Sequence, residues 1–178
     1  KKLYYKMDNH WNLTGGNIAS EMLIDQMKKD RPDWDIPTFP NFEWHDSTIS
    51  WGNLKASLGI DHLLDEDVFP ILSNTKAKRI ENIGYPVSPS FSHLYEEHYK
   101  NPIDITAPRI LFFRDSYTYQ MSPFLNECFS ESLYIFDLWH YKLDKNIVES
   151  YKPDAVVFMT VEANLHLLLR FGADEIVH

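Results

Sequence analysis

The sequence predicts an α/β fold in which a mainly parallel sheet is covered by helices on both faces. Three apolar runs, residues 110–113, 133–137 and 155–161, alternate with segments whose apolar residues have helical spacing. Continuous apolar runs are typical of parallel strands buried on both faces, and their alternation with helices is typical of α/β proteins. In such sheets the ligand cleft lies outside the carboxyl ends of the strands.

Helices are predicted before, between and after these strands. The apolar positions from Ile18 to Met27 fall on one helix face, which extends to about Lys29, with Asn12 or Thr14 as the N-cap. The same spacing predicts three further helices at about residues 120–130, 144–151 and 165–171.

The middle of the chain, about residues 32–105, is predicted to hold an insertion within a single domain of residues 1–178. It contains short strands at 42–45 and 47–51, a short helix at 52–59, and loops with weak strands over 76–105, which cross a sheet edge or a cleft. The acidic run 61–69 lacks calcium-loop spacing and is interpreted as a solvated loop.

Composition limits the possible functions. Of the 178 residues, 44% are hydrophobic, which is typical of a globular protein, and the net charge of −9 argues against a nucleic-acid partner. The one cysteine, Cys128, lies among apolar residues and is predicted to pack in the core. The histidines lack metal-ligand spacing, so neither a metal nor another cofactor is predicted. No signal peptide is visible and no apolar run reaches membrane-spanning length, so any anchor would lie outside this chain.

Polar residues follow each predicted strand at the same edge of the sheet, namely Asp115 with Ser116, Asp137 with His140, and Glu162 with Asn164. Ser116 falls at a strand-to-helix turn, where backbone N–H groups point outward and can hold an oxyanion. Asp115 is predicted to brace this turn. A serine in this position becomes a nucleophile when a base and a group that orients the base lie beside it.

Residues 8–11, Asp-Asn-His-Trp, supply both groups. On an extended segment Asp8 and His10 project to one side, so the carboxylate can orient one imidazole nitrogen and leave the other as a base. The alternative is an ordinary Asp-x-His pair on the surface. Trp11 either forms a wall of the site or belongs to the core. His10 and Ser116 are 106 residues apart, so only the fold can bring them together.

Two more residues at this edge have alternative roles. Arg114 either stabilises an oxyanion or an anionic substrate, or pairs with one of the many acids. Asn164 either donates its amide to the oxyanion or caps the following helix.

Several motifs resemble those of the DHHW and alginate O-acetyltransferase (AlgX- and AlgJ-like) families, which are SGNH-hydrolase-like proteins of bacterial envelopes. The opening Tyr-Tyr-Lys-Met-Asp-Asn-His-Trp of residues 4–11 resembles their first motif. Further similar segments follow in the same order, at residues 14–17, 52–59, 114–117, 123–125, 136–138 and 152–157.

The resemblance implies an SGNH-hydrolase-like, flavodoxin-like three-layer sandwich with a circularly permuted motif order, in which the Asp and His precede the Ser. It implies that Asp8 orients, His10 is the base and Ser116 is the nucleophile. Two residues depart from the family pattern. Arg114 replaces the glycine of the usual Gly-Asp-Ser, and Asn9 replaces a histidine of the DHHW motif, which is expected to be neutral for the chemistry.

The implied function is transfer of an acetyl group, through an acetyl-serine, onto hydroxyls of a bacterial cell-envelope polysaccharide. The resemblance places this reaction outside the cytoplasm, with a membrane-bound O-acyltransferase partner that supplies the acetyl donor. Aromatic residues between 34 and 51 either stack on sugar rings or pack a small sheet. Two alternative functions remain open, an acetylesterase with the same three residues and a non-catalytic polysaccharide-binding module.

Overall fold

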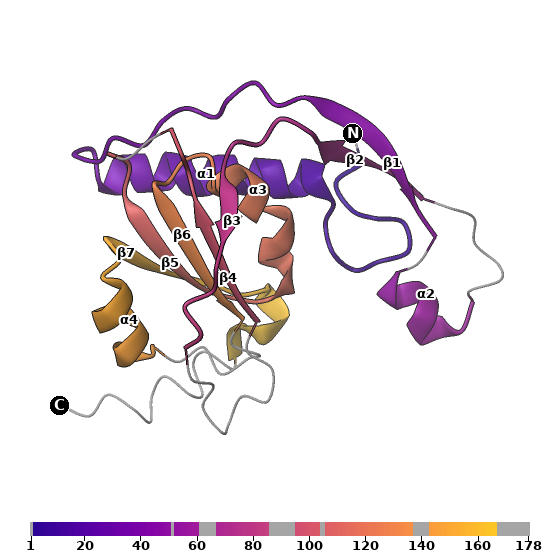
Figure 1. Ribbon diagram of the computed structural model, residues 1–178. Helices are drawn as coiled ribbons and strands as arrows, with labels where there is room; N and C mark the ends of the chain where they lie inside the picture. Colours follow the sequence, from indigo (N-terminus) through magenta and orange to yellow (C-terminus); the bar gives the residue numbers. More distant parts are fainter. Residues whose placement is uncertain are drawn as a thin grey trace.

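The computed structural model describes residues 2–50, 52–60, 67–85, 95–103, 106–136 and 143–166 (Figure 1). Its elements in chain order are α1 (Leu13–Asp30), β1 (Trp44–Ile49), α2 (Asn53–Leu58), β2 (Asp67–Leu72), β3 (Lys78–Ile80), β4 (Tyr95–Lys100), β5 (Arg109–Arg114), the 3-10 helix η1 (Ser116–Gln120), α3 (Ser122–Leu125), β6 (Glu131–Phe136), α4 (Lys145–Tyr151), β7 (Ala155–Met159) and the 3-10 helix η2 (Glu162–Asn164). None of the described helices is both long and apolar enough to span a membrane.

The main sheet has five strands in the order β3-β4-β6-β5-β7. Strand β5 runs parallel to both β6 and β7, so the three predicted apolar runs do form adjacent parallel strands. The sheet as a whole is mixed, because β4 pairs antiparallel with β6 and β3 pairs antiparallel with β4. The prediction of a mainly parallel sheet was therefore wrong for this half of the sheet.

Strand β4 lies within the segment 76–105 that was predicted to hold loops and weak strands, and its bounds could not be predicted because its buried positions are polar. Glu96 and His98 are only 7% and 5% exposed, although both lie on a strand that pairs along its whole length with β6. Glu96 accepts hydrogen bonds from the backbone N–H groups of residues 83–85, which compensates for its burial. A search for apolar runs cannot detect a strand whose buried side chains are polar.

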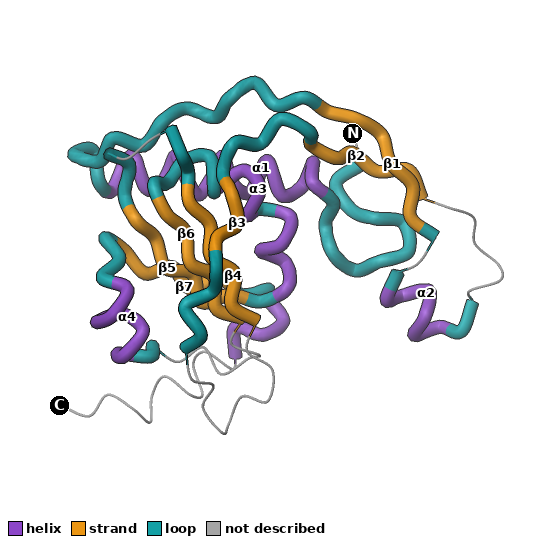
Figure 2. Tube along the Cα trace, in the orientation of Figure 1, coloured by secondary structure: helices purple, strands orange, loops and turns teal. Residues whose placement is uncertain are grey.

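Both faces of the sheet are covered, which gives three layers (Figure 2). Ile110 and Phe112 of β5 belong to a buried cluster with side chains of α1 and α3. Leu111 and Phe113 point to the other face and pack with side chains of α4. All four side chains are at most 1% exposed, so β5 is buried on both faces of the sheet.

Most predicted helices form. Helix α1 begins after Asn12, whose side chain accepts hydrogen bonds from the backbone N–H groups of residues 14 and 15, and α2 and α4 also match their predicted ranges. The single helix predicted at 120–130 was wrong, because the chain there forms the short helices η1 and α3, followed by turns. Pro123 lies in the first turn of α3. Proline has no backbone N–H to donate within a helix, so it is tolerated in a first turn but would interrupt a single helix over 120–130. Most of the helix predicted at 165–171 lies outside the described residues.

The two short strands predicted at 42–45 and 47–51 are one strand, β1, which pairs antiparallel with β2. Strand β2 begins at Asp67, within the predicted acidic loop. Asp67 is 3% exposed and accepts a hydrogen bond of 2.5 Å from the Lys6 backbone N–H, so this acid holds the N-terminal segment in place. The description of residues 32–105 as an insertion within one domain stays a prediction.

Candidate active site

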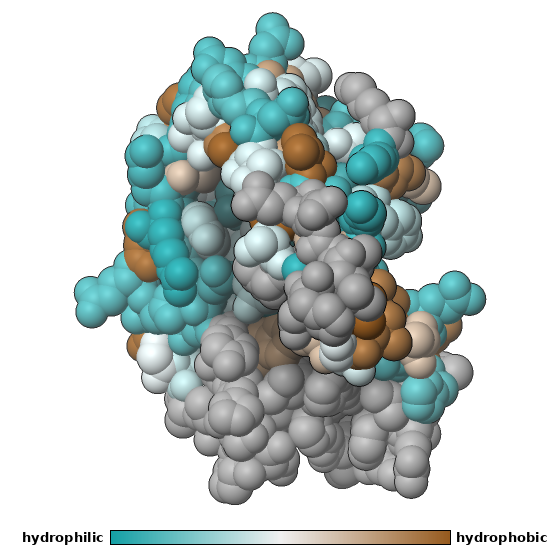
Figure 3. All heavy atoms as spheres, turned by 90° about the vertical axis from the view of Figure 1, so that its right-hand side faces the viewer, coloured by the Kyte–Doolittle hydropathy of each residue, from teal (hydrophilic) through white to brown (hydrophobic). Residues whose placement is uncertain are grey.

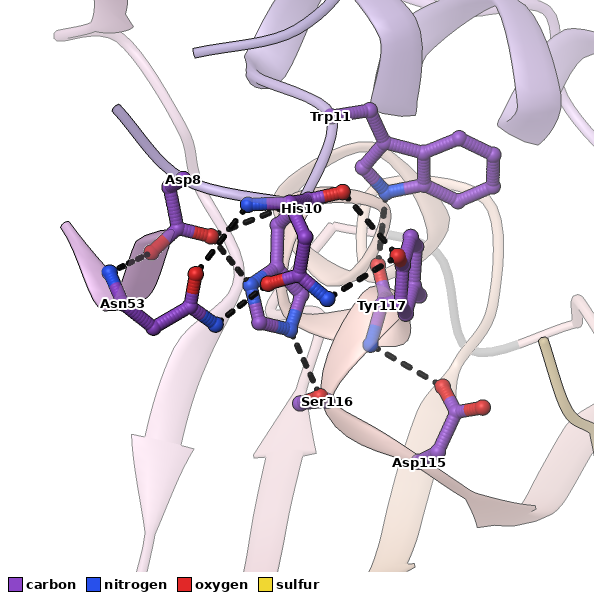
Figure 4. Close-up of polar contacts among 8 residues, drawn as sticks. Asp8, His10, Trp11, Asn53, Asp115, Ser116 and Tyr117 are labelled. Carbon is purple, nitrogen blue, oxygen red and sulfur yellow. Dashed lines mark hydrogen bonds and ion pairs between the residues drawn. The ribbon is translucent and has the colours of Figure 1, made fainter. Parts of the chain in front are cut away.

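The N-terminal segment folds back on itself in front of α1. Tyr4 and Trp11 form an isolated antiparallel bridge, and the Asn12 backbone N–H donates to the Leu3 carbonyl at 2.8 Å. The residues between them form bends, so the expectation that Asp8 and His10 lie on an extended segment was wrong. Their side chains nevertheless point toward each other, because the loop is bent tightly around them (Figure 4).

Asp8, His10 and Ser116 form a continuous chain of hydrogen bonds (Figure 4). The distance from His10 Nδ1 to Asp8 Oδ1 is 2.5 Å, and the distance from His10 Nε2 to Ser116 Oγ is 2.7 Å. Ser116 is the first residue of η1 and lies beyond the carboxyl end of β5, as the sequence predicts. The fold thus brings together three side chains that can accept a proton from a hydroxyl and stabilise the resulting charge.

Hydrogen bonds keep Asp8 ionised. Burial pushes its pKa upward, but the backbone N–H groups of Asn53 and His10 and the His10 ring outweigh that effect and hold the pKa below the ordinary value of 3.8. The Asn53 N–H donates to Asp8 Oδ2 at 2.9 Å, and the His10 N–H donates to Oδ1 at 2.9 Å. The negative charge favours a proton on the facing Nδ1 of His10, which leaves Nε2 to accept the Ser116 proton.

Two glycines allow the elements of the site to approach closely. A Cβ atom at Gly52 would lie 2.1 Å from the Met7 carbonyl oxygen, and one at Gly16 would lie 2.0 Å from the Gln120 carbonyl oxygen. Gly52 therefore lets α2 contact the loop that carries Asp8. Gly16 lets α1 contact the end of η1, the element that begins with Ser116.

Tyr117 contributes to the site, although the sequence interpretation assigned it no role. Its ring centroid lies 4.7 Å from that of His10, its hydroxyl donates to the Asn9 carbonyl at 3.0 Å, and its own carbonyl accepts from Trp11 Nε1 at 2.8 Å. Burial raises the pKa of Tyr117, so its hydroxyl stays protonated as a donor. The only signal in the sequence was its position directly after Ser116.

Asn53 also escaped the sequence interpretation. Its backbone N–H contacts Asp8, and its side chain exchanges hydrogen bonds with Asn9, whose backbone N–H donates to Asn53 Oδ1 at 3.1 Å. Asn9 also reaches Tyr117, since its side-chain amide lies 3.3 Å from the phenol oxygen. These contacts hold the loop that positions His10.

Arg114 is paired with an acid. Its guanidinium lies 2.8 Å from Glu97 Oε2 of β4 and is stacked between the Tyr119 and Phe136 rings, at 3.9 and 5.0 Å from their centroids. The side chain is 1% exposed. Of the two roles that the sequence left open, the structure shows the ion pair, which joins β4 to the end of β5.

The other polar residues predicted at this edge of the sheet do not join the hydrogen-bonded chain of Asp8, His10 and Ser116 in the described structure. Asp115 braces the turn, because its carboxylate accepts from the backbone N–H groups of Tyr117 at 2.9 Å and Val161 at 2.5 Å. Asn164 ends η2, and its side-chain amide makes no hydrogen bond within the part of the chain that the structure describes. Asp137 and His140 lie outside the described residues.

Trp11 fits both of its predicted positions. It packs against the core cluster of α1, and it also lines a hollow of about 330 Å³ together with Asp115, Tyr117 and Glu162. This hollow adjoins the turn that carries Ser116.

The Ser116 backbone N–H has no hydrogen-bond acceptor among the described residues, so it is available to an oxygen atom of a ligand. No group of three metal-binding side chains occurs in the described ranges.

A serine at the end of a central strand, hydrogen-bonded to a His–Asp pair, is the arrangement of serine hydrolases and acyltransferases. No family model matches the sequence, and the comparison with curated proteins found no match. Among solved structures, the chain has the fold of Bacillus cereus PatB1 with a sulfonyl adduct, at a TM-score of 0.65 and 14% identity over 92% of this chain and 62% of that chain. A DHHW family protein from Eubacterium siraeum matches at a TM-score of 0.63 and 15% identity, over 94% of this chain and 63% of that one.

A second PatB1 structure from Bacillus cereus matches at a TM-score of 0.63 and 14% identity, over 92% of this chain and 64% of that chain. The chain thus spans under two thirds of the length of these proteins. The shared fold agrees with the resemblance to the DHHW family that the motifs predict.

Proposed function

We propose that this chain carries the active site of an O-acetyltransferase that modifies hydroxyls of a bacterial cell-envelope polysaccharide through an acetyl-serine at Ser116. The observation that carries the proposal is the hydrogen-bonded chain from Asp8 through His10 to Ser116, at 2.5 and 2.7 Å. The shared fold with PatB1, a peptidoglycan O-acetyltransferase, supports the type of acceptor.

In the first half-reaction Ser116 Oγ attacks the carbonyl carbon of an acetyl donor while His10 Nε2 takes the hydroxyl proton. Asp8 stabilises the imidazolium that forms, because its carboxylate stays ionised and in contact with Nδ1. The Ser116 backbone N–H is the first donor to the tetrahedral oxyanion. The intermediate collapses when the donor oxygen leaves with the proton from His10, and acetyl-Ser116 remains.

The second half-reaction repeats these steps with a sugar hydroxyl. His10 Nε2 takes the proton of the hydroxyl as its oxygen attacks the acetyl-serine carbonyl, and the same N–H stabilises the second oxyanion. Collapse releases the sugar acetate and returns the proton to Ser116. An esterase would use the same groups with water as the second nucleophile.

Arg114 and Asn164 are the two candidates for a second hydrogen-bond donor to the oxyanion. Arg114 is committed to Glu97 and its side chain is 1% exposed, which makes it a poor donor. Asn164 belongs to the segment that follows Glu162, a residue of the hollow beside Ser116, and its amide is uncommitted in the described structure. We therefore favour Asn164 for this role.

The proposed reaction also requires a location and a partner protein. The reaction takes place outside the cytoplasm, where envelope polysaccharides are found, and a membrane-bound O-acyltransferase supplies the acetyl groups. No cofactor takes part, because a serine, a histidine and a carboxylate suffice for acyl transfer.

Intact-mass analysis after incubation with 4-nitrophenyl acetate tests the covalent step. We expect wild type to gain the mass of one acetyl group, and the Ser116→Ala and His10→Ala variants to gain none. The matched control is Ser150→Ala, because Ser150 is exposed on α4, which packs on the sheet face opposite α1, and its hydroxyl contacts Tyr85 and Asn146. An unmodified wild-type protein that releases no nitrophenol would refute the mechanism and leave a glycan-binding module.

Adding polysaccharide fragments then separates transferase from esterase. A transferase loses its acetyl group faster in the presence of a suitable acceptor, and the acetyl group appears on the sugar. An esterase loses it to water at a rate that the acceptor does not change.

A further inference from the structure

A second hollow, of about 510 Å³, lies between the start of α1 and the β1–β2 hairpin. Figure 3 shows the side of the molecule that carries this hairpin and α2, where hydrophobic atoms lie among hydrophilic ones. The walls of the hollow combine aromatic, charged and uncharged polar side chains, which include Lys2, Thr14, Asn17, Trp44, Asp46 and Phe69. Nothing in the proposed acetyl transfer uses these side chains.

Trp44 offers an open aromatic surface to this hollow. Its side chain is 42% exposed, although its ring contacts Phe124 of the core, with ring centroids 5.8 Å apart and planes inclined by 30°. Asp46 lies two residues further along β1 and therefore on the same face of the strand. A tryptophan that packs on the core through one part of its ring and is exposed through the rest, next to a carboxylate, is suited to a ligand with an apolar face and a polar rim.

Two polar groups of the hollow are uncommitted. The Asp46 carboxylate and the Thr14 hydroxyl make no hydrogen bond or ion pair within the described ranges. Lys2 supplies a positive charge to the hollow; its side chain is 71% exposed, and its ammonium lies 3.7 Å from Asp67. One cation and one free anion suit a neutral ligand better than a charged one. A pyranose ring has this chemistry, with a face of C–H groups and a rim of hydroxyls that donate and accept hydrogen bonds.

The hollow adjoins the candidate active site. Asn12 lines it, while the preceding residue, Trp11, lines the hollow beside Ser116. Consecutive Cα atoms are about 3.8 Å apart, so the chain from His10 to Thr14 spans at most about 15 Å. A ligand of several sugar units is therefore long enough to span this length of chain.

We propose that the hollow beside Trp44 is a subsite for a neutral pyranose unit of the acceptor polysaccharide, away from the unit that receives the acetyl group. The role as an acceptor subsite rests on the proposed function, whereas sugar binding at Trp44 does not. The sugar ring stacks on Trp44, and Asp46 and Thr14 hydrogen-bond its hydroxyls.

Binding and acetylation are measured separately to test this. Isothermal titration calorimetry with chitopentaose and cellopentaose gives dissociation constants for wild type, Trp44→Ala and Asp46→Ala. Trp34→Ala is the matched control, because Trp34 contacts Arg31 at the other end of α1 and does not line the hollow. The rate of acetyl-enzyme formation from 4-nitrophenyl acetate is measured on the same proteins.

We expect at least one of the two sugars to bind wild type, and Trp44→Ala to weaken its binding about tenfold, which corresponds to about 1.4 kcal/mol. Asp46→Ala weakens binding severalfold, Trp34→Ala leaves it unchanged, and all three acetylate like wild type. Asp46 is exposed and has no ion-pair partner among the described residues, so this variant is informative even if Trp44→Ala fails to fold.

The proposal is overturned if neither sugar binds wild type, or if the Trp44 and Asp46 variants both bind as wild type does. Failure of the proposed function looks different. In that case the sugars still bind at Trp44, but no acetyl-serine forms and Ser116→Ala changes nothing.

Discussion

Replacing Asp8 with asparagine tests the hydrogen-bond chain most directly, because the two side chains have the same shape. The carboxylate accepts from the Asn53 N–H at one oxygen and from two donors of His10 at the other. An amide has only one acceptor oxygen, so its NH₂ group must face one of these donors. Asp8→Asn therefore loses hydrogen bonds to a charged group and leaves a donor without an acceptor.

The magnitude follows from these contacts. Hydrogen bonds to a charged group contribute about 1.5–3 kcal/mol each, and the Asp8 side chain is only 12% exposed, so we expect a loss of about 2–3 kcal/mol in the free energy of unfolding. For a chain of this size that lowers Tm by roughly 5–10 °C. The rate of acetyl-enzyme formation falls about 10³–10⁴-fold, because His10 loses the group that fixes its tautomer.

The difference in stability depends on pH in a defined direction. The pKa of Asp8 is lower in the folded protein than its ordinary value of 3.8, so its charge stabilises the fold above pH 3.8. That contribution is lost as the pH falls through the folded-state pKa. The gap in Tm between wild type and Asp8→Asn is therefore wide at neutral pH and narrows below pH 3.8.

Calorimetry between neutral and acidic pH, together with stopped-flow acetylation, provides the assay. The control is Asp33→Asn, since Asp33 pairs with Arg31 on the surface and its removal changes Tm little. A gap in Tm that stays constant with pH, or an acetylation rate within tenfold of wild type, would show that Asp8 does not act as described.

Three further predictions follow from buried contacts. Gly16→Ala lowers the free energy of unfolding by about 1–3 kcal/mol and slows acetylation, because its Cβ would lie 2.0 Å from a backbone carbonyl of η1; urea unfolding and the acetylation rate check this. Arg114→Met destabilises by about 3 kcal/mol in urea unfolding, because Glu97 loses its buried guanidinium partner and the remaining cation, Arg79, is 3.6 Å away; pairing the change with Glu97→Leu recovers most of the loss. Burial raises the pKa of Cys128 to about 12, so iodoacetamide leaves the native thiol unmodified at pH 8 and alkylates it in urea, as mass spectrometry would show.

Local patterns in the sequence determined the centre of the fold. The apolar runs that become β5, β6 and β7 are identified by their composition alone, although only β5 and β6 are largely buried and β7, at the end of the strand order, is partly exposed. The N-cap at Asn12 and the end of α2 at Gly59 are likewise local, because capping satisfies backbone groups within a few residues.

The sequence also singled out the three side chains of the site, Ser116 by its strand-to-helix turn, and Asp8 and His10 by their spacing and by the resemblance of residues 4–11 to the DHHW family motif. Their contact across 106 residues is a property of the tertiary structure alone, since the Nε2–Oγ distance of 2.7 Å depends on α1 packing against η1 at Gly16. The roles of Tyr117 and Asn53 depend on the same packing, and their places within the similar segments 114–117 and 52–59 did not reveal those roles.

Long-range pairing decided the rest. Strands β1 and β4 are stabilised by partners that are distant in sequence, and β4 buries Glu96 and His98, so its pattern resembles an exposed loop. Arg114 is chemically suited both to an anion and to a carboxylate, and only the position of Glu97 on β4 decides between them. Polar side chains can be buried wherever the fold supplies a partner, and that partner cannot be found from neighbouring residues.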